Sequence, residues 1–235
     1  SGMLTNLQDR DVFFIDEIHR VNTTVEEYLY SAMEDFKIDI LIDSGPNART
    51  VRIDLEPFTL VGATTRLGNI STPMRDRFGA IFRLDFYQKD EIFKILKRTA
   101  SILEMNVQDD ALTEIAGRSR GTPRIANRVL KRVRDFAQVK NVKEISLEDA
   151  RSSLDSIGID ENGLENMDRK ILKNLIVNYN GGPTGGKSLA ISINEDIQTI
   201  EDVYEPYLIK EGFIERTSRG RIATDKAYAL FDLKK

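Results

Sequence analysis

The spacing of apolar residues predicts an α/β region in the first part of the chain. Short continuous apolar runs at 12–15 and 58–63 predict two buried strands. The first run is typical of a central parallel strand that is covered on both faces. A further strand is predicted at 80–86, and these strands place a first domain over residues 1–87.

One amphipathic helix and one β-hairpin are predicted between the first two strands. Thr23 and Glu26 form a capping box, and apolar residues at helical spacing continue to Phe36. Residues 37–55 then change to a period of two, which predicts a hairpin. The apolar residues on one face of that hairpin are Ile38, Ile40, Ile42, Val51, Ile53 and Leu55. This face packs either on the domain's own core or on a partner protein or neighbouring subunit.

Helical patterns dominate the rest of the chain. An all-helical domain is predicted over residues 88–158, with helices at 89–104, 109–118, 122–140 and 146–156. A third domain, 159–235, begins near a polar linker and contains helical segments at 164–179, 187–193 and 196–211, then strands at 213–217 and 221–224. Three helices followed by a hairpin predict a winged helix.

Composition narrows the functional classes. The 235 residues contain no cysteine, which excludes a disulfide framework and a cysteine-based zinc site. No run approaches the ~20 apolar residues of a membrane span and no signal-peptide pattern is present, so we expect a cytoplasmic protein. The net charge is −4, so any contact with nucleic acid requires a local basic patch. Residues 1–3 look like an expression scar, and we expect the chain to begin inside a domain.

Polar side chains follow the first two strands at their carboxyl ends. Asp16 and Glu17 come directly after the first strand, and Thr64 and Thr65 follow the second. Ligands of open α/β sheets bind beyond the carboxyl ends of the strands. The acidic pair therefore either lies in a reactive site beside a hydroxyl group or solvates the end of a strand.

The segment GGPTGGKS at 181–188 has the spacing of a phosphate-binding P-loop. A P-loop requires a buried strand before it, whereas an amphipathic helix precedes residue 181. We therefore interpret the segment as a turn between two helices of the winged helix.

Several arginines stand where a phosphate could bind. Arg77 lies on a short helix that begins with Thr72 as N-cap and Pro73, and Arg124 lies in the first turn of a helix that begins with Thr122 and Pro123. A cation at a helix N-terminus opposes the helix dipole, so Arg124 favours a bound phosphate, although both arginines could be ordinary surface residues.

Three arginines, Arg216, Arg219 and Arg221, crowd onto the predicted wing with Glu215 and Asp225 as the nearby acidic residues. We favour contact with the DNA backbone over a solvated turn. The single histidine, His19, follows the acidic pair, and we favour a structural role over a catalytic one.

Taken together, these motifs resemble the RuvB family of AAA+ ATPases, the motors of bacterial Holliday-junction branch migration. The resemblance rests on FFIDEIHR at 13–20, GATTR at 62–66, STPMRDRFG at 71–79, GTPRIANR at 121–128 and EDVYEPYLIKEGFIERT at 201–217. It covers essentially the whole chain from Leu4 onward. The family's Walker A P-loop lies upstream of the Walker B strand, and that region is absent from this sequence.

The resemblance implies roles for the strand-end residues. Asp16 would be the Walker B aspartate that holds Mg²⁺ through water, and Glu17 would polarise the attacking water. Thr65, or Thr64, would be sensor 1, a hydroxyl that detects the γ-phosphate. Arg77 would be the arginine finger, which reaches in trans into a neighbour's site.

The resemblance also implies further nucleotide contacts and partners. Arg124 would be sensor 2, Tyr87 would line the nucleotide site, and the family makes nucleotide contacts at the positions of Glu34, Asp35 and Phe36. The implied cofactors are ATP or ADP and Mg²⁺. We expect this chain neither to bind nor to hydrolyse them on its own, because the P-loop is missing.

The implied partners are double-stranded DNA at Holliday junctions, a RuvA-type junction-binding protein at the 37–55 hairpin, and identical subunits in a hexameric ring. Three alternatives stay open: another AAA+ ATPase such as a clamp loader or remodeller, a non-enzymatic winged-helix DNA-binding protein, and a purely structural fragment.

Overall fold

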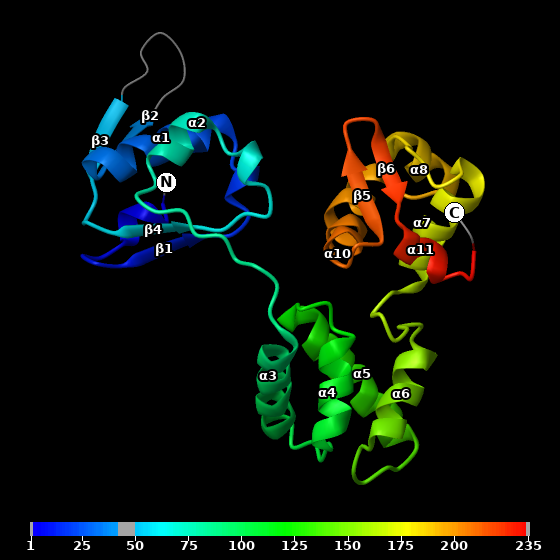
Figure 1. The fold of residues 1–235 in the computed structure, drawn as a ribbon. Coiled ribbons are helices and arrows are strands. Elements are labelled where there is room, and N and C mark those ends of the chain that lie inside the picture. Colours follow the sequence, from blue (N-terminus) through cyan, green and yellow to red (C-terminus); the bar gives the residue numbers. More distant parts are fainter. Residues whose placement is uncertain (1, 42–49, 234–235) are drawn as a thin grey trace. The chain divides into compact units, whose positions relative to one another are not determined.

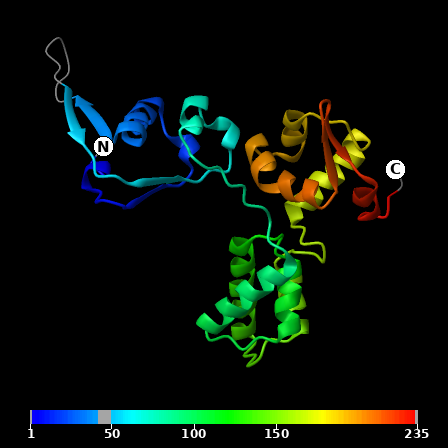
Figure 2. The same ribbon diagram turned by 60° about the vertical axis from the view of Figure 1, so that its left-hand side comes forward.

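The chain folds into two compact units, residues 1–84 and 85–235, in a computed structural model that describes residues 2–41 and 50–233 (Figures 1 and 2). Within these described ranges no helix is both long enough and apolar enough to cross a membrane.

Two parallel strands form the centre of the first unit. β1 (Val12–Ile15) pairs with β4 (Thr59–Gly62), with Val12 opposite Thr59 and Ile15 opposite Gly62. Parallel pairing is confirmed, but coverage on both faces is wrong for the described residues, because the side chains of Val12 and Phe14 are 63% and 58% exposed. Alternate residues of a strand face opposite sides, so only Phe13 and Ile15 reach the core.

The N-cap of the helix after β1 lies one residue before the predicted cap. α1 (Thr23–Asp35) has Asn22 as its N-cap, and the Asn22 side-chain oxygen accepts a hydrogen bond from the Val25 amide at 2.9 Å. The predicted capping box at Thr23 is therefore wrong, and Glu26 instead bonds to side chains outside the first turn. The apolar stripe is confirmed by buried Leu29 and Ala32.

The predicted hairpin is confirmed by antiparallel pairing of β2 (Lys37–Leu41) with β3 (Thr50–Asp54). Ile38 lies opposite Ile53 and Ile40 opposite Val51, so the apolar residues share one face. Ile38 is fully buried in the unit's own core, whereas Val51 is 41% exposed. The predicted turn and Ile42 lie outside the described residues.

The predicted strand at 80–86 is wrong. After α2 (Thr72–Asp76), whose N-cap is Ser71 rather than Thr72, residues 79–88 form neither helix nor strand. A strand needs a hydrogen-bonded neighbour, and the sheets described in this unit pair only β1 with β4 and β2 with β3. Phe82 and Leu84 are accordingly 86% and 94% exposed.

Short 3₁₀ turns in this unit are η1 (Leu4–Asn6), η2 (Ile18–Arg20) and η3 (Leu67–Asn69).

Four helices with their own apolar core begin the second unit (Figure 1). They are α3 (Lys89–Ile102), α4 (Asp109–Gly117), α5 (Pro123–Val139) and α6 (Leu147–Ser156), which confirms the four predicted helices. Ser146 and Asp149 cap α6 reciprocally.

The second part of this unit has the predicted order of three helical segments and a hairpin. Its elements are α7 (Asn166–Tyr179), α8 (Gly186–Ile193), α9 (Ile197–Thr199), η4 (Ile200–Tyr204), α10 (Glu205–Lys210), β5 (Ile214–Thr217), β6 (Gly220–Ala223) and α11 (Asp225–Ala229). The third predicted helix is thus α9, a π-helical turn and α10 in succession. Pro206 lies just after that π turn, and its missing amide and bulky ring oppose regular α-helix there.

Tyr207 is a buried phenol within this part of the chain. Its hydroxyl donates to the Asn162 carbonyl at 2.7 Å, and its side chain belongs to the core. Burial raises the pKa of Tyr207 to about 12, because the charged phenolate would lose its hydration. The neutral phenol therefore contributes stability at pH values below the ordinary tyrosine pKa of ~10, and that contribution is lost as pH rises toward about 12.

We predict that Tyr207 ionises at a pH of about 12, above the ordinary tyrosine pKa of ~10. Phenolate absorbance followed during alkaline titration should show a late component that disappears in Tyr207→Phe. Relative to the parent, Tyr207→Phe should also lose less stability between pH 10 and 12, because it has no phenol to ionise. Tyr87→Phe is the control, since Tyr87 is 46% exposed. Removal of an early-titrating component by Tyr207→Phe would contradict the prediction.

Candidate functional site

Polar residues that follow β1 and β4 meet at one edge of the first unit. Pairing continues beyond the strands, since the Ala63 amide donates to the Ile15 carbonyl and the Ile18 amide donates to the Ala63 carbonyl, each at 2.9 Å. This register places the residues after Ile15 beside those after Ala63. The predicted meeting of carboxylates and hydroxyls is confirmed.

Glu17 is held against Thr65. Its carboxylate accepts hydrogen bonds from the Thr65 amide at 3.3 Å and the Thr65 hydroxyl at 3.1 Å. The hydrogen bond from the Thr65 amide is the main reason that the pKa of Glu17 lies below its usual value, so the carboxylate is charged at neutral pH. Glu17 has a left-handed backbone with φ 48°, which is uncommon for a residue with a side chain and occurs often at functional sites.

The other strand-end residues have distinct contacts. Asp16 is exposed, and its carboxylate accepts a hydrogen bond from the Glu17 amide at 3.0 Å. The Thr64 hydroxyl accepts a bond from the Arg66 amide and lies 2.9 Å from His19 Nδ1. Thr64 thus serves the local fold, whereas Thr65 faces the acidic pair.

His19 is a buried, paired histidine, as the structural interpretation predicts. Its side chain is 8% exposed, and Nδ1 lies 3.2 Å from Glu17 Oε2 as well as beside Thr64. The ring therefore contacts residues that follow both strands.

Arg77 is held by neighbouring groups of the first unit. It follows the last residue of α2, and its Nη1 donates to the Pro73 carbonyl at 2.7 Å. Its Nε lies 2.9 Å from Glu34 Oε1, and its guanidinium lies 4.4 Å from the centre of the Tyr30 ring. This arginine is therefore not an ordinary solvated side chain, and sequence reasoning missed the role of Tyr30.

The end of α1 carries three of the predicted nucleotide contacts. Phe36 packs edge-on against Phe58 at 5.9 Å between ring centres and belongs to the unit's core, so a nucleotide contact by Phe36 stays a prediction. Glu34 pairs with Arg77, and Asp35 is exposed. A left-handed backbone at Phe36 ends α1 and turns its side chain into the core.

Two predicted nucleotide contacts of the second unit lie near each other. The Tyr87 amide donates to the Gly121 carbonyl at 2.9 Å, just before α5. Gly121 has φ 65°, and a Cβ there would lie 2.6 Å from the Tyr87 carbonyl oxygen, so this close approach requires glycine. Thr122 is the N-cap and Pro123 opens α5, as predicted, which leaves Arg124 exposed in the first turn.

Arg221 is mostly buried and paired with carboxylates. Its side chain is 8% exposed, and its guanidinium donates to Glu205 and Glu201. A Cβ on Gly186 would lie 2.5 Å from Arg221 Nη1, so this glycine makes room for the guanidinium at the start of α8. The DNA contact of Arg221 stays a prediction, and these ion pairs disfavour it.

The charge balance on the wing was also mispredicted. Arg216 is partly exposed and lies 3.3 Å from Glu201 and 3.7 Å from Glu205, so the acidic neighbours are not confined to Glu215 and Asp225. Arg219 is exposed at the turn. Glu201 and Glu205 stand four residues apart on one helix face, a like-charge spacing that could have indicated a cation between them.

A second buried arginine was missed by sequence reasoning. Arg120 pairs with the fully buried carboxylate of Asp168 and donates to the Gly163 carbonyl at 2.9 Å. Its guanidinium also lies 4.8 Å from the centre of the Tyr207 ring. These contacts tie the segment before α5 to the start of α7.

The segment GGPTGGKS is a turn between helices, as predicted. α7 ends at Tyr179, Asn180 has a left-handed backbone, and α8 starts at Gly186. The segment also pairs with the wing, since the Thr184 amide donates to the Arg221 carbonyl at 3.0 Å. With a helix before it and the wing beside it, the segment is not a P-loop.

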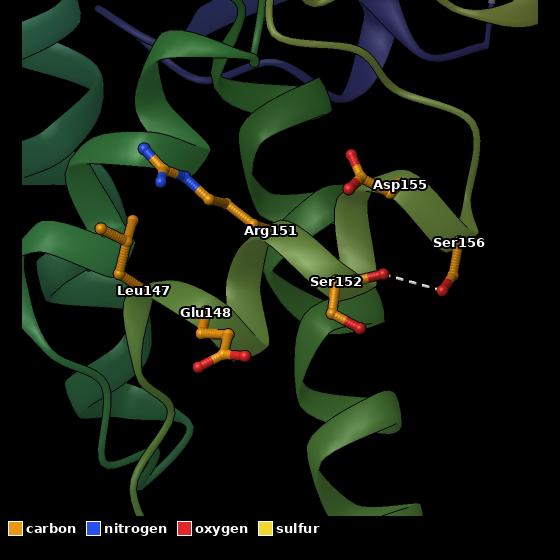
Figure 3. Close-up of a pocket in the computed structure, with 6 residues that line it drawn as sticks. All are labelled: Leu147, Glu148, Arg151, Ser152, Asp155 and Ser156. Atoms are coloured by element: carbon orange, nitrogen blue, oxygen red, sulfur yellow. Dashed lines mark hydrogen bonds between the residues drawn. The ribbon is translucent and has the colours of Figure 1, made fainter.

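One surface depression shares no lining residue with these groups. Its lining residues, shown in Figure 3, all belong to α6: Leu147, Glu148, Arg151, Ser152, Asp155 and Ser156. The Ser156 hydroxyl donates to the Ser152 carbonyl of the same helix at 2.7 Å. The depression therefore follows one helix and gathers no opposed catalytic groups.

The parallel strand pair, the helical part and the winged helix, taken in this order, define the AAA+ class of proteins with a winged-helix domain. Residues 1–84 match the Holliday junction DNA helicase RuvB P-loop domain, residues 87–160 the RuvB AAA lid domain, and residues 161–232 the RuvB C-terminal winged helix domain. The chain belongs to the RuvB family. This confirms the predicted fold class and rules out a clamp loader or another AAA+ branch.

Relatives and solved structures agree with this assignment. The chain is 57% identical over 232 residues to the Holliday junction branch migration complex subunit RuvB of Salinibacter ruber, covering 99% of this chain and 67% of the relative. It is 59% identical to the subunit of the same name from Prosthecochloris aestuarii, covering 98% of this chain and 67% of the relative. The Thermotoga maritima RuvB Holliday junction branch migration motor superposes with a TM-score of 0.87 at 48% identity, covering 100% of this chain and 74% of that one.

We predict that Arg221→Ala destabilises the winged helix by about 3 kcal/mol or more, because it leaves the buried Glu205 carboxylate without its partner. Hydrogen exchange of the β6 and α10 amides in urea would measure the loss. Arg219→Ala is the control and should change stability by less than about 0.5 kcal/mol, since Arg219 is exposed. Unchanged exchange in Arg221→Ala would show that the ion pairs do not support the fold.

Proposed function

We propose that this chain is the Walker B, lid and winged-helix part of an ATP-driven motor that moves double-stranded DNA at Holliday junctions. The observation that carries the proposal is the meeting of Glu17 with Thr65 at the edge of the β1–β4 sheet, in a chain of the RuvB family. The relatives are named as subunits of a Holliday junction branch migration complex.

The strand-end residues suit nucleotide hydrolysis. ATP with Mg²⁺ would supply the phosphoryl group whose transfer to water drives the motor. Asp16 presents an exposed carboxylate, which fits a magnesium ion that takes its other ligands from water and phosphate oxygens. Glu17 is charged and oriented by Thr65, so it can polarise a water molecule. Thr65 is our choice for sensor 1, because its hydroxyl contacts the Glu17 carboxylate, whereas the Thr64 hydroxyl contacts Arg66 and His19.

Other residues would complete the nucleotide site. Arg77 would act as the arginine finger toward a neighbouring subunit of a hexameric ring, so assembly would be a condition of activity. Arg124, exposed at the start of α5, would bind phosphate as sensor 2 with Tyr87 nearby. Asp35, exposed at the end of α1, stays a candidate nucleotide contact.

We infer that these 235 residues alone do not hydrolyse ATP. The family binds the β- and γ-phosphates in a P-loop, and the P-loop spacing in this sequence, at 181–188, falls on the turn between α7 and α8. Without that loop, Asp16 and Glu17 lack the phosphate cradle that would bring the nucleotide to them.

The winged helix would hold DNA through its wing. Arg219 is exposed at the turn between β5 and β6, and Arg216 is partly exposed beside it. Contact with the phosphate backbone would position DNA without reading its sequence, as a motor on any sequence requires.

The 37–55 hairpin is the proposed docking surface for a RuvA-type protein. Its face is buried near Ile38 and becomes exposed at Val51, nearer the turn. The base of the hairpin thus belongs to the unit's core, while Val51 leaves apolar surface for a partner.

We place the proposed motor activity in the bacterial cytoplasm, where the chromosome lies.

We predict that Glu17→Gln lowers DNA-stimulated ATP turnover by at least about 10² in a full-length chain that joins these residues to the family's P-loop, because the general base is lost. Asp16→Asn should lower turnover by weakening Mg²⁺ binding. Glu56→Gln is the control, since Glu56 is exposed and lies before β4, at the amino end of that strand. The 235-residue chain should show no turnover. Full activity of Glu17→Gln would refute the assigned role.

We predict that Arg219→Ala weakens DNA binding of the 235-residue chain about equally for unrelated sequences. The slope of log affinity against log salt should fall by about 1, because one phosphate contact is lost. Arg10→Ala is the control, since Arg10 is an exposed arginine of the first unit. An unchanged salt slope would exclude Arg219 as a phosphate contact.

A further inference from the structure

A polar cluster fastens the short helix α2 to α1. The hydroxyl of Ser71, the N-cap of α2, donates to Glu26 Oε2 at 2.9 Å. The Tyr30 hydroxyl donates to the same carboxylate oxygen at 2.9 Å and lies 3.1 Å from Ser71 Oγ. Buried Met74 adds an apolar contact with the core, so α2 is fixed by its cap and by one side chain.

Three residues spaced by four form one stripe along α1: Glu26, Tyr30 and Glu34. Residues four apart on a helix share a face. The first two fasten α2, and the second and third contact Arg77 where α2 ends. One helix face therefore fixes both the helix that carries Arg77 and the guanidinium itself.

Three groups contact the guanidinium of Arg77. The Tyr30 ring lies 4.4 Å from its centre, Glu34 lies 2.9 Å from Nε, and the Pro73 carbonyl accepts from Nη1 at 2.7 Å. The Arg77 side chain is still 26% exposed, so it is held in place without being enclosed. A long arginine side chain samples many rotamers when it is free, and holding it in one orientation reduces the entropy lost on binding a phosphate.

We propose that Tyr30 and Glu34 are positioning residues that hold Arg77 ready to act on the nucleotide of a neighbouring subunit. The inference rests on the proposed function of Arg77 as the arginine finger. It gives Glu34 a role through Arg77 in place of the nucleotide contact expected from sequence.

The exposure of Glu34 separates this role from a structural one. Its side chain is 55% exposed, so Glu34→Gln opens no cavity in the core. Tyr30→Phe keeps the ring beside Arg77 and removes only the hydroxyl, while the bond between Ser71 and Glu26 still fastens α2. Tyr30→Leu removes the ring. Positioning therefore predicts that Tyr30→Phe keeps most of the activity that Tyr30→Leu loses.

The test uses mixed rings of a full-length chain that joins these residues to the family's P-loop. Acceptor subunits carry Arg77→Ala and keep their own acidic pair. Donor subunits carry Glu17→Gln, so they cannot hydrolyse ATP but still present Arg77. Because the acceptors lack the finger and the donors lack the base, turnover in the mixture measures the finger supplied in trans.

Donors that also carry Tyr30→Leu or Glu34→Gln should restore turnover about tenfold less well, since a misplaced catalytic group loses much of its effect. The KM for ATP should not change, because the finger acts in the transition state. Donors with Tyr30→Phe, or with Glu27→Gln at an exposed position on the same helix, should restore turnover as well as the parent donor.

The outcomes distinguish the positioning role of Tyr30 and Glu34 from the proposed function of Arg77 as the arginine finger. If parent donors fail to restore turnover, Arg77 does not act in trans and the proposed function of that residue fails. If parent donors restore turnover and the Tyr30→Leu and Glu34→Gln donors match them, the positioning role is overturned while the finger stands. A Glu34→Gln donor that restores turnover better than the parent would also overturn it, because Glu34 would then restrain Arg77.

A second measurement uses the 235-residue chain alone. The Arg77 Nε–Hε signal in nuclear magnetic resonance should carry a ring-current shift from Tyr30 that Tyr30→Leu removes and Tyr30→Phe keeps. An unshifted signal in the parent chain would show that the guanidinium does not lie on the ring in solution and would overturn the proposal.

Discussion

The parallel pairing of β1 with β4 is the constraint on which the proposed chemistry depends. It brings together Glu17 and Thr65, which stand 48 residues apart in the sequence. A slip of one residue would turn alternate side chains to the opposite face and move both strand ends. The left-handed backbone of Glu17 and the buried ring of His19 then fix the carboxylate against Thr65, so the register of two short strands sets the position of the proposed general base.

Burial and partners, more than the residue type, separate the roles of the arginines. Arg221 has lost most of its hydration, and two carboxylates compensate for that loss, so it stabilises the fold. Arg219 stays hydrated on the wing and is available to a phosphate. Arg77 is intermediate, since an ion pair and an aromatic ring orient it while part of it stays exposed. An arginine that must bind a partner's phosphate benefits from this intermediate state, because it is ordered without being fully desolvated.

Periodicity in the sequence predicted most element types, because an apolar stripe depends on spacing alone. It failed where a distant partner decides the outcome. Residues 80–86 have strand-like composition but no strand beside them among the described residues, and one face of β1 is exposed for a similar reason. The N-cap of α1 is Asn22 and not the predicted Thr23, because it is the Asn22 side-chain oxygen that reaches the Val25 amide. Arg221 was placed on the surface because its partners, Glu201 and Glu205, lie on another element.

The acidic pair and the holder of Arg77 belong to one continuous stretch of chain. Glu17 leads through η2 into α1, whose cap is Asn22 and whose far end carries Glu34. A hydrogen-bonded helix of this length transmits displacement along its axis with little bending. The proposed active-site carboxylate and the contacts that hold Arg77 are therefore joined by η2 and α1 alone. If Arg77 acts in trans as proposed, a shift of Glu17 that displaced α1 would also displace the contacts that hold Arg77.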